Sequence, residues 1–177
     1  VRTGLNPQAV LGSDVMTRVE AAVTKPGAAL RLMTLIRDAV AGMAGELGPA
    51  AEIWLSGNTV MHHLFCGLDV EPLSHAPFET PSLASWSGSA SDLGWGPEAK
   101  VVFLGGLGSF VGSDILAGIV ASGMAEREAA TALLDLGTNG EIVVGNRDRL
   151  LCASTAAGPA FEAGRITMGM RAAEGAI

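Results

Sequence analysis

The most informative part of the sequence reads Leu133-Leu134-Asp135-Leu136-Gly137-Thr138-Asn139-Gly140-Glu141-Ile142-Val143-Val144. Asn-Gly between two apolar runs predicts a β-hairpin, because both turn positions tolerate a positive φ. Asp135 falls at the end of an expected buried strand, where a metal ion would offset the cost of burying its charge. Gly137 and Gly140 allow backbone amides to approach an anion, and the hydroxyl of Thr138 adds a donor. We therefore interpret the hairpin as a phosphate site, with an ordinary β-turn as the alternative.

The chain has 177 residues, which is about the size of one domain. Of these residues, 49% are hydrophobic and 16% are charged. The formal net charge of -7 argues against a nucleic-acid partner, because phosphate backbones are bound by clustered Lys and Arg. The same charge is compatible with ATP, which backbone amides and a metal ion can hold. No signal peptide or apolar run of about 18 residues is evident, so we expect a cytoplasmic protein without a membrane partner.

The cysteines and the two ends of the sequence limit the interpretation further. Cys66 and Cys152 are far apart and form no C-x-x-C pair, so a zinc or iron–sulfur site within the chain has no support. Val1 and Ile177 end the sequence abruptly. We therefore treat the chain as a possible piece of a longer protein.

Helical and strand patterns alternate along most of the chain, and short strands follow one another near its end. Helices are predicted at residues 14–22 with Ser13 as the N-cap, from Pro26 to Gly45 or Gly48, at 59–65 before Gly67, and at 114–125 with Ser113 as the N-cap. Strands are predicted at residues 52–55, 101–104, 131–136, 141–145 and 149–153, with a long irregular segment at 69–98. This order favours a parallel sheet with crossovers, then an antiparallel meander. A domain boundary is predicted near residues 126–130.

Other polar segments have simpler explanations. Gly57-Asn58-Thr59 joins a strand to a helix, where amides attract anions, but on the residues alone a routine connection is favoured. Packing or capping roles are expected for His62, His63 and His75.

Three further segments carry little chemical information. Residues 105–114 lack the G-x-G-x-x-G fingerprint, and the helix dipole alone explains Asp114. Ser154 has no evident His–Asp partners, which argues against a serine hydrolase. Glu162 is either an acid/base group or a carboxylate in the first turn of a helix expected to begin near Gly158.

A set of motifs distributed over nearly the whole chain is specific in combination. The motifs are Asn6-Pro7-Gln8, Gly12-Ser13-Asp14-Val15, Gly57-Asn58-Thr59-Val60-Met61-His62-His63, Gly108-Ser109-Phe110-Val111-Gly112-Ser113-Asp114, Asp135-Leu136-Gly137-Thr138-Asn139-Gly140-Glu141, Ser154-Thr155-Ala156-Ala157-Gly158-Pro159-Ala160-Phe161-Glu162 and Gly169-Met170-Arg171-Ala172. Together they resemble the reductive activators of corrinoid proteins. Those activators belong to the superfamily of sugar kinases, acetate kinase, heat-shock chaperones and actin, and use ATP to drive reduction of Co(II) corrinoids to Co(I).

The resemblance implies a truncated α/β, ribonuclease H-like (actin-like ATPase) fold. Residues 1–130 would form most of a first subdomain without its three opening strands. Residues 131–177 would begin the second subdomain with the phosphate hairpin and a strand. Because one phosphate loop and the adenosine contacts would be missing, we expect the chain alone to be inactive.

The resemblance also implies cofactors, partners and roles for residues. The parent protein would use ATP, Mg²⁺ and a [2Fe–2S] cluster in an N-terminal ferredoxin domain absent from this chain, and would act on a corrinoid protein as a homodimer. Asp135 and Glu141 would be catalytic, and Asp135 would bind the metal. The cofactor-binding residues would be Gly137, Thr138, Asn139, Gly140, Gly57, Asn58, Thr59 and Gly158.

Two alternative functions stay open. The chain could belong to the activator of a radical dehydratase, which carries a [4Fe–4S] cluster between two subunits. It could instead be a non-catalytic docking or dimerisation module that uses residues 154–161 and the loop at 69–98. Cysteines upstream of Val1 in a plant-type ferredoxin spacing would favour the corrinoid activator.

Overall fold

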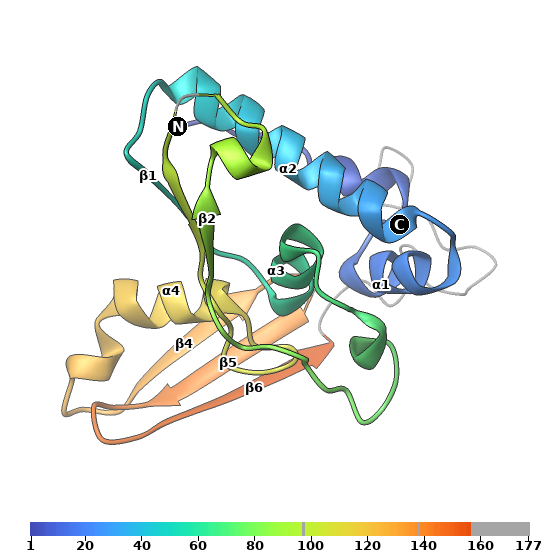
Figure 1. Cartoon of the computed structure of the whole chain (residues 1–177). Helices are drawn as coiled ribbons and strands as arrows, with labels where there is room; N and C mark the ends of the chain where they lie inside the picture. Colours follow the sequence, from blue (N-terminus) through green and yellow to red (C-terminus); the bar gives the residue numbers. More distant parts are fainter. Residues whose placement is uncertain (97, 138, 157–177) are drawn as a thin grey trace, which may run out of the picture. The chain divides into compact units, whose positions relative to one another are not determined.

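The computed structural model describes residues 1–96, 98–137 and 139–156 and divides the chain into two compact units, Val1–Ala117 and Gly118–Ile177 (Figure 1). Each unit is described by itself. Within the described ranges, no helix combines the length and the apolar character that crossing a bilayer requires.

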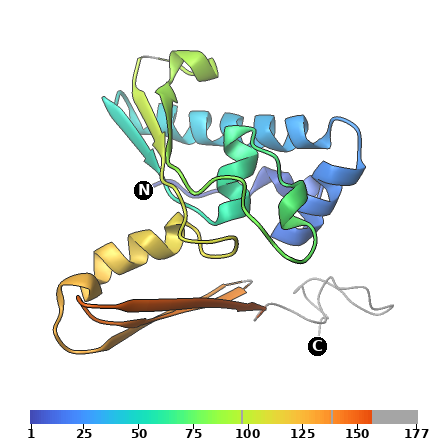
Figure 2. The ribbon, with the colours of Figure 1, turned by 60° about the horizontal axis from the view of Figure 1, so that its bottom comes forward.

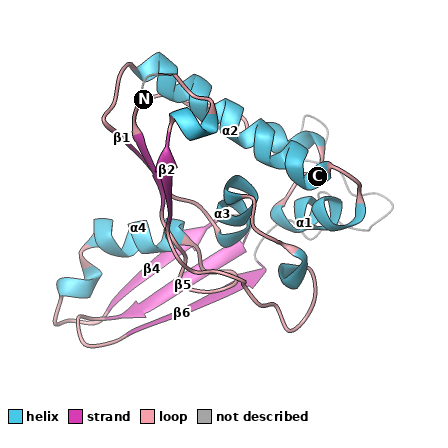
Figure 3. Cartoon of the chain, in the orientation of Figure 1, coloured by secondary structure: helices cyan, strands magenta, loops and turns pink. Residues whose placement is uncertain are grey.

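The first unit combines a three-stranded sheet with helices (Figure 3). Its elements are η1 (Pro7–Val10), α1 (Val15–Thr24), α2 (Ala28–Leu47), β1 (Glu52–Leu55), α3 (Thr59–Cys66), η2 (Glu71–Leu73), β2 (Trp86–Ser89), η3 (Ser91–Leu93), β3 (Lys100–Phe103) and the first turns of α4 (Ser113–Ser122). The strand order is β1-β3-β2, with β1 parallel to β3 and β2 antiparallel to it. The parallel pair with α3 in its crossover confirms the predicted α/β arrangement.

The strand β2 was not predicted, because residues 69–98 were expected to be irregular throughout. Its sequence Trp86-Ser87-Gly88-Ser89 contains a single large apolar residue and shows no clear alternation. The segment becomes a strand through pairing with β3, in which Trp86 lies opposite Phe103 and Ser89 opposite Lys100. This pairing is a tertiary contact and leaves no local signal in the sequence.

The helix ends differ slightly from the prediction. Asp14, not Ser13, caps α1: its carboxylate accepts from the Thr17 amide, and the Thr17 hydroxyl accepts from the Asp14 amide. This reciprocal capping box satisfies two backbone donors at once, which a lone serine cap cannot do. Gly45 lies inside α2, and Gly48 ends that helix.

The core of the first unit forms around α3. Val60 and Leu64 pack with Leu32 of α2 in one cluster, while Phe65 packs with Val101 and its neighbours in a second cluster. Phe65 is fully buried, which contributes roughly 2–3 kcal/mol relative to an exposed position. The two clusters hold α3 in place and thereby position the turn that precedes it.

The second unit is an antiparallel sheet in the order β4-β5-β6 (Figure 2). Its elements are the end of α4, η4 (Met124–Glu126), β4 (Thr131–Leu136), β5 (Asn139–Gly145) and β6 (Leu150–Ala156), which confirms the predicted meander. The strand β4 was expected to be buried, but Leu134 is 56% and Leu136 81% exposed. One face of the sheet is therefore open, because alternate side chains of each strand point to opposite faces.

Candidate functional site

The hairpin loop is shorter than predicted, because β5 begins at Asn139 and not at Glu141. Asn139 and Gly140 belong to β5, where Gly140 pairs with Leu136 on β4 and with Thr155 on β6. The Gly137 amide donates to the Asn139 carbonyl across 3.0 Å, so Asn139 and Gly140 are not the two central turn residues. Pairing on both sides of β5 outweighs the turn preference of Asn-Gly. Thr138 lies outside the described residues.

Asp135, Glu141 and Ser154 form one row across the three strands of the second unit. Asp135 lies opposite Glu141, and Glu141 lies opposite Ser154. The Ser154 hydroxyl donates to Oε1 of Glu141 across 3.0 Å. The register therefore brings together two predicted catalytic residues and one residue that the sequence analysis did not assign to the site.

The reason first given for a metal at Asp135 was wrong, since its carboxylate is exposed and carries no burial cost. A different physical reason remains. Carboxylates directly opposite each other in a sheet repel, and a divalent cation beside them lowers that repulsion. Carboxylate and hydroxyl oxygens are the ligands that Mg²⁺ prefers, so the row suits Mg²⁺ by its chemistry. Within the described ranges, no cluster of three or more His, Cys, Asp or Glu residues is arranged to hold a metal.

Ser154 is brought next to Glu141 by the register of β5 and β6. Nothing in the sequence around Ser154 links it to Glu141. Glu141 and Ser154 become neighbours because β5 and β6 pair with Gly145 opposite Leu150. Counting back from the turn at residues 146–149 would have placed the two side chains on the same face.

The second predicted site, Gly57-Asn58-Thr59, lies in the first unit at the carboxyl end of β1. The Asn58 carboxamide oxygen accepts from the Met61 amide at 2.9 Å and caps α3. The Thr59 hydroxyl donates to the Gly108 carbonyl at 2.7 Å. Both side chains therefore serve the connection itself, which agrees with the routine linkage favoured on the residues alone.

Ser113, at the start of α4, holds the same turn. Its amide donates to the Gly57 carbonyl at 2.9 Å, and the Gly57 amide lies 3.1 Å from the Ser113 hydroxyl oxygen. A Cβ on Gly112 would lie 2.4 Å from the Asn58 Cα, so the backbones are in direct contact. A nucleotide role for Gly57, Asn58 and Thr59 stays a prediction, and Gly158 lies outside the described residues.

The histidines of α3 pack in the core, as predicted. His62 and His63 are 3% and 0% exposed. His63 Nδ1 lies 2.8 Å from the Thr59 carbonyl, and its Nε2 lies 3.0 Å from the Thr80 hydroxyl. The pKa of His63 is lowered, because the effect of burial exceeds the opposing effects of the Thr59 carbonyl and the Asp69 charge. Burial and, secondarily, the His63 charge lower the pKa of His62.

His75 does not follow that prediction. It is exposed, and its Nε2 lies 2.9 Å from the Glu71 carboxylate. This hydrogen bond, the principal cause, raises the pKa of His75.

Acidification is expected to destabilise the first unit, because the fold favours neutral His62 and His63. Their pKa values lie below the ordinary 6.5, so below that pH the unfolded chain binds more protons than the folded chain. The stability that comes from keeping these histidines neutral is therefore fully present above pH 6.5. It is lost as the pH falls toward their pKa values in the folded chain. Urea unfolding at several pH values, followed by tryptophan fluorescence, measures this loss.

Two variants test whether His63 causes the loss of stability at acidic pH. His63→Gln is expected to make the free energy of unfolding depend less on pH in the acid range. His75→Gln is the control and keeps the acid loss, because the raised pKa of His75 contributes stability at low pH that is lost as the pH rises. A pH-independent free energy of unfolding in the unmodified chain would contradict the prediction.

The two cysteines do not fit an iron–sulfur cluster. Burial raises the pKa of the Cys66 thiol to about 12, with Arg37 opposing, whereas cluster ligands are thiolates. Cys152 is exposed and belongs to the other unit.

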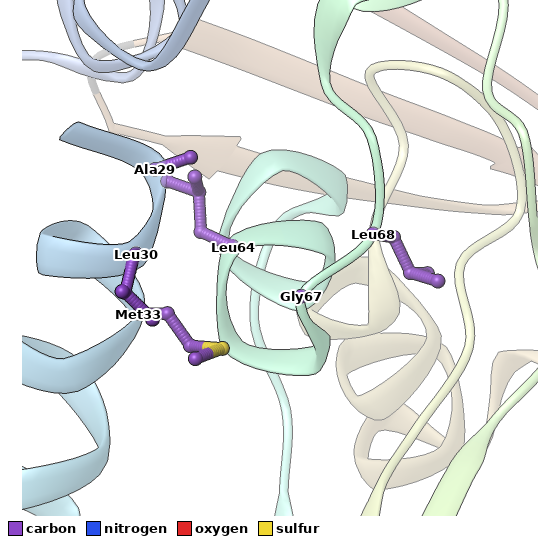
Figure 4. A pocket seen from close by; sticks show the side chains of 6 residues that line it. All are labelled: Ala29, Leu30, Met33, Leu64, Gly67 and Leu68. Atoms are coloured by element: carbon purple, nitrogen blue, oxygen red, sulfur yellow. The ribbon is translucent and has the colours of Figure 1, made fainter. Parts of the chain in front are cut away.

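Two apolar cavities lie in the first unit, away from the predicted site residues. One of about 230 Å³ lies between α2 and α3 and is lined by Ala29, Leu30, Met33, Leu64, Gly67 and Leu68 (Figure 4). The other, of about 420 Å³, lies between the end of α2, the start of β1 and Trp95. Their linings lack the charged groups that a triphosphate requires.

Known protein families match this chain over nearly its whole length. Residues 1–127 match the family model described as the RACo middle region, and residues 129–177 match the C-terminal domain of RACo, the ASKHA domain. ASKHA domains have the actin-like ATPase fold, so that fold class is supported.

Individual relatives agree with the family models. The chain is 37% identical, over 98% of its length, to the corrinoid activation enzyme RamQ of Eubacterium limosum, of which it spans 30%. A 67-residue part, 38% of the chain, is 39% identical to 12% of the [Co(II) methylated amine-specific corrinoid protein] reductase of Methanosarcina barkeri. A solved structure of a reductive activator for corrinoid,iron-sulfur protein matches with a TM-score of 0.77 and 32% identity, over 98% of this chain and 29% of that one. These names do not favour the dehydratase activator or the non-catalytic module.

The two family models together cover nearly the whole chain, including the predicted phosphate hairpin. The chain therefore belongs to the RACo family, with residues 1–127 in its middle region and residues 129–177 in its C-terminal ASKHA domain.

Proposed function

We propose that the chain is the ATPase-like part of a reductive activator, which uses ATP to drive reduction of a Co(II) corrinoid protein to Co(I). An iron–sulfur domain of [2Fe–2S] type elsewhere in the full-length protein would supply the electron that reduces the cobalt. The observation that carries the proposal is the Asp135–Glu141–Ser154 row beside the hairpin, within the residues that match the ASKHA domain. The names of the relatives support the corrinoid substrate.

The row supplies the groups that phosphate chemistry needs. Asp135 would order Mg²⁺ and its water shell, and the loop residues Gly137, Thr138, Asn139 and Gly140 would cradle the phosphates. Glu141, held by the Ser154 hydroxyl, would orient the attacking water. When bound, Mg²⁺ supplies charge that stabilises the transferring phosphoryl group.

The domain arrangement and cellular context belong to the same proposal. Residues 1–130 would form the first subdomain and residues 131–177 the start of the second, and the family models meet between residues 127 and 129 in support of this boundary. The first compact unit of the structure ends earlier, at Ala117 inside α4. The parent protein would be a cytoplasmic homodimer.

The proposal is tested on the full-length protein that contains this sequence. Protein with its iron–sulfur domain reduced is mixed with a Co(II) corrinoid protein, and Co(I) is followed by its absorbance. We expect Co(I) to accumulate with Mg-ATP and not with a non-hydrolysable analogue, because hydrolysis drives the uphill electron transfer. Equal Co(I) formation without nucleotide would contradict the proposal.

A further inference from the structure

Two loops of the first unit present an aromatic pair, of which Phe78 is exposed and Phe110 is half-buried. Phe78 lies on the loop at residues 74–85, and Phe110 lies on the loop at residues 104–112 that follows β3. Their rings meet edge to face with centroids 5.1 Å apart, yet Phe78 remains 44% exposed. Leu107, on the second loop, is 43% exposed. Exposed aromatic side chains are enriched at protein interfaces relative to the rest of the surface.

The backbones of the two loops are fixed by hydrogen bonds. The Ser109 hydroxyl donates to the Phe78 carbonyl at 2.8 Å and joins the loops directly. The Gly105 amide donates to the Ser85 hydroxyl at 3.0 Å, and the Thr59 hydroxyl holds the Gly108 carbonyl. Such a surface loses little conformational entropy when a partner binds, which favours affinity.

The core of the unit also holds the first loop. Thr80, two residues after Phe78, lies 3.0 Å from Nε2 of the buried His63, and its hydroxyl donates to the Ser82 carbonyl. The aromatic pair is therefore supported by a buried side chain and not by surface contacts alone.

Acidic side chains lie beside the aromatic pair. Glu79 directly follows Phe78, and its amide donates to the Pro72 carbonyl, which brings it near Glu71. Both carboxylates are exposed; that of Glu71 is hydrogen-bonded to His75, whereas Glu79 has no basic side chain next to it in the sequence. Between Asp69 and Ala117 the sequence contains one Lys or Arg, Lys100, so this part of the first unit is strongly negative.

We propose that the aromatic loop face, defined as Phe78, Leu107 and Phe110 with Glu71 and Glu79, docks the corrinoid protein through an apolar patch rimmed by Lys or Arg on that partner. This inference rests on the proposed function and adds where, and by which chemistry, the client protein is recognised. The acidic rim raises the association rate with a basic partner, and the aromatic pair slows dissociation.

Charge also decides against a second copy of this chain as the occupant. In a two-fold symmetric interface the same face meets itself, so Glu71 and Glu79 of one copy would lie near those of the other. Such like-charge juxtaposition disfavours an interface. A basic-rimmed client has the opposite charge and carries no such penalty.

The test uses the full-length protein and a Co(II) corrinoid protein, with affinity measured by calorimetry. Phe78→Ala is expected to weaken binding by about tenfold or more, because it removes an exposed anchor. Trp54→Ala is the matched control, since Trp54 is an exposed aromatic residue elsewhere on the same unit, at 57% exposure. Its affinity is expected to change by less than about twofold. Equal effects of the two substitutions would overturn the proposal.

A charge reversal tests the rim without removing packing. Glu79→Lys is expected to lower the association rate and to flatten its salt dependence, whereas Glu98→Lys, an exposed control, changes the rate less. Loss of a dimer in sedimentation, with unchanged corrinoid-protein affinity, would identify a second copy as the occupant and overturn the proposal.

One further readout separates this inference from the proposed function. ATP hydrolysis without the client is expected to be unchanged in Phe78→Ala and in Glu79→Lys, because neither residue belongs to the hairpin. If the unmodified protein binds the corrinoid protein without reducing it, and Phe78→Ala weakens that binding, the proposed function fails while the docking face stands. If the unmodified protein reduces it and the variants bind normally, only the docking face fails.

Discussion

Asp135→Ala is expected to reduce ATP-dependent cobalt reduction by at least about 10²-fold, which is typical of removing a group that stabilises charge in the transition state. Asp135 lies at the hairpin, opposite Glu141, where its carboxylate would order Mg²⁺ beside the phosphates. Without this ligand, the metal loses its position relative to the phosphoryl group. The rate of Co(I) formation by the full-length variant at saturating Mg-ATP measures the effect.

The same substitution is expected to leave the fold intact. Asp135 is exposed, and substitutions at such positions change the free energy of unfolding by about 0.5 kcal/mol or less. Removing a charge opposite Glu141 also lowers like-charge repulsion. Urea unfolding therefore separates a chemical loss from a folding loss.

A matched control lies in the same unit. Asp148 is an exposed aspartate on the turn between β5 and β6, and its carboxylate lies 3.8 Å from Arg147. Asp148→Ala removes the same charge away from the hairpin, so cobalt reduction is expected to stay within about twofold of the unmodified rate. Undiminished ATP-driven reduction in Asp135→Ala would remove Asp135 from the proposed mechanism.

Gly112→Ala is expected to give the largest loss of stability. The added Cβ would lie 2.4 Å from the Asn58 Cα and 2.6 Å from the Gly57 carbonyl oxygen, closer than atoms approach without repulsion. Both contacts are to backbone, so relief requires the turn after β1 to separate from the start of α4. That separation strains the Ser113–Gly57 hydrogen bonds. We expect a loss of about 3 kcal/mol or more, the upper range for overpacking.

Gly42→Ala is the contrasting substitution in the same unit. Gly42 lies within α2, and nothing lies within 4 Å of the position that an added Cβ would take. Replacing an unhindered helical glycine by alanine stabilises by roughly 0.5–1 kcal/mol, so the two substitutions are expected to differ in sign. Urea unfolding of both variants gives the comparison, and similar free energies of unfolding would show that the contact at Gly112 relaxes without cost.

The sequence predicted elements well wherever the signal is local. Asn58 and Gly67 delimit α3 as expected, because a cap and a left-handed terminal glycine act within one turn. The strands β1, β3 and β4 were found from short apolar runs. By contrast, β2 and the position of the hairpin turn depend on partner strands distant in sequence, so local preference misjudged both.

The candidate site shows the same division. The residues Asp135 to Glu141 could be singled out from composition and spacing alone, and family resemblance agreed with the later comparisons. The exposure of Asp135 could not be predicted, because its apolar neighbours in the sequence indicated a buried strand. In the structure Leu134 and Leu136 are exposed. Burial depends on what packs against a strand, which its own residues do not specify.

The sequence by itself determined the α/β class, the antiparallel meander and the segment that carries the proposed phosphate chemistry. Tertiary structure alone decided that Ser154 reaches Glu141, that Ser113 holds Gly57, and that Phe78 meets Phe110. Periodicity and capping act over a few residues and can be read along the chain. Strand register and loop contacts join residues 13 to 56 positions apart, so they are set by packing of the whole unit.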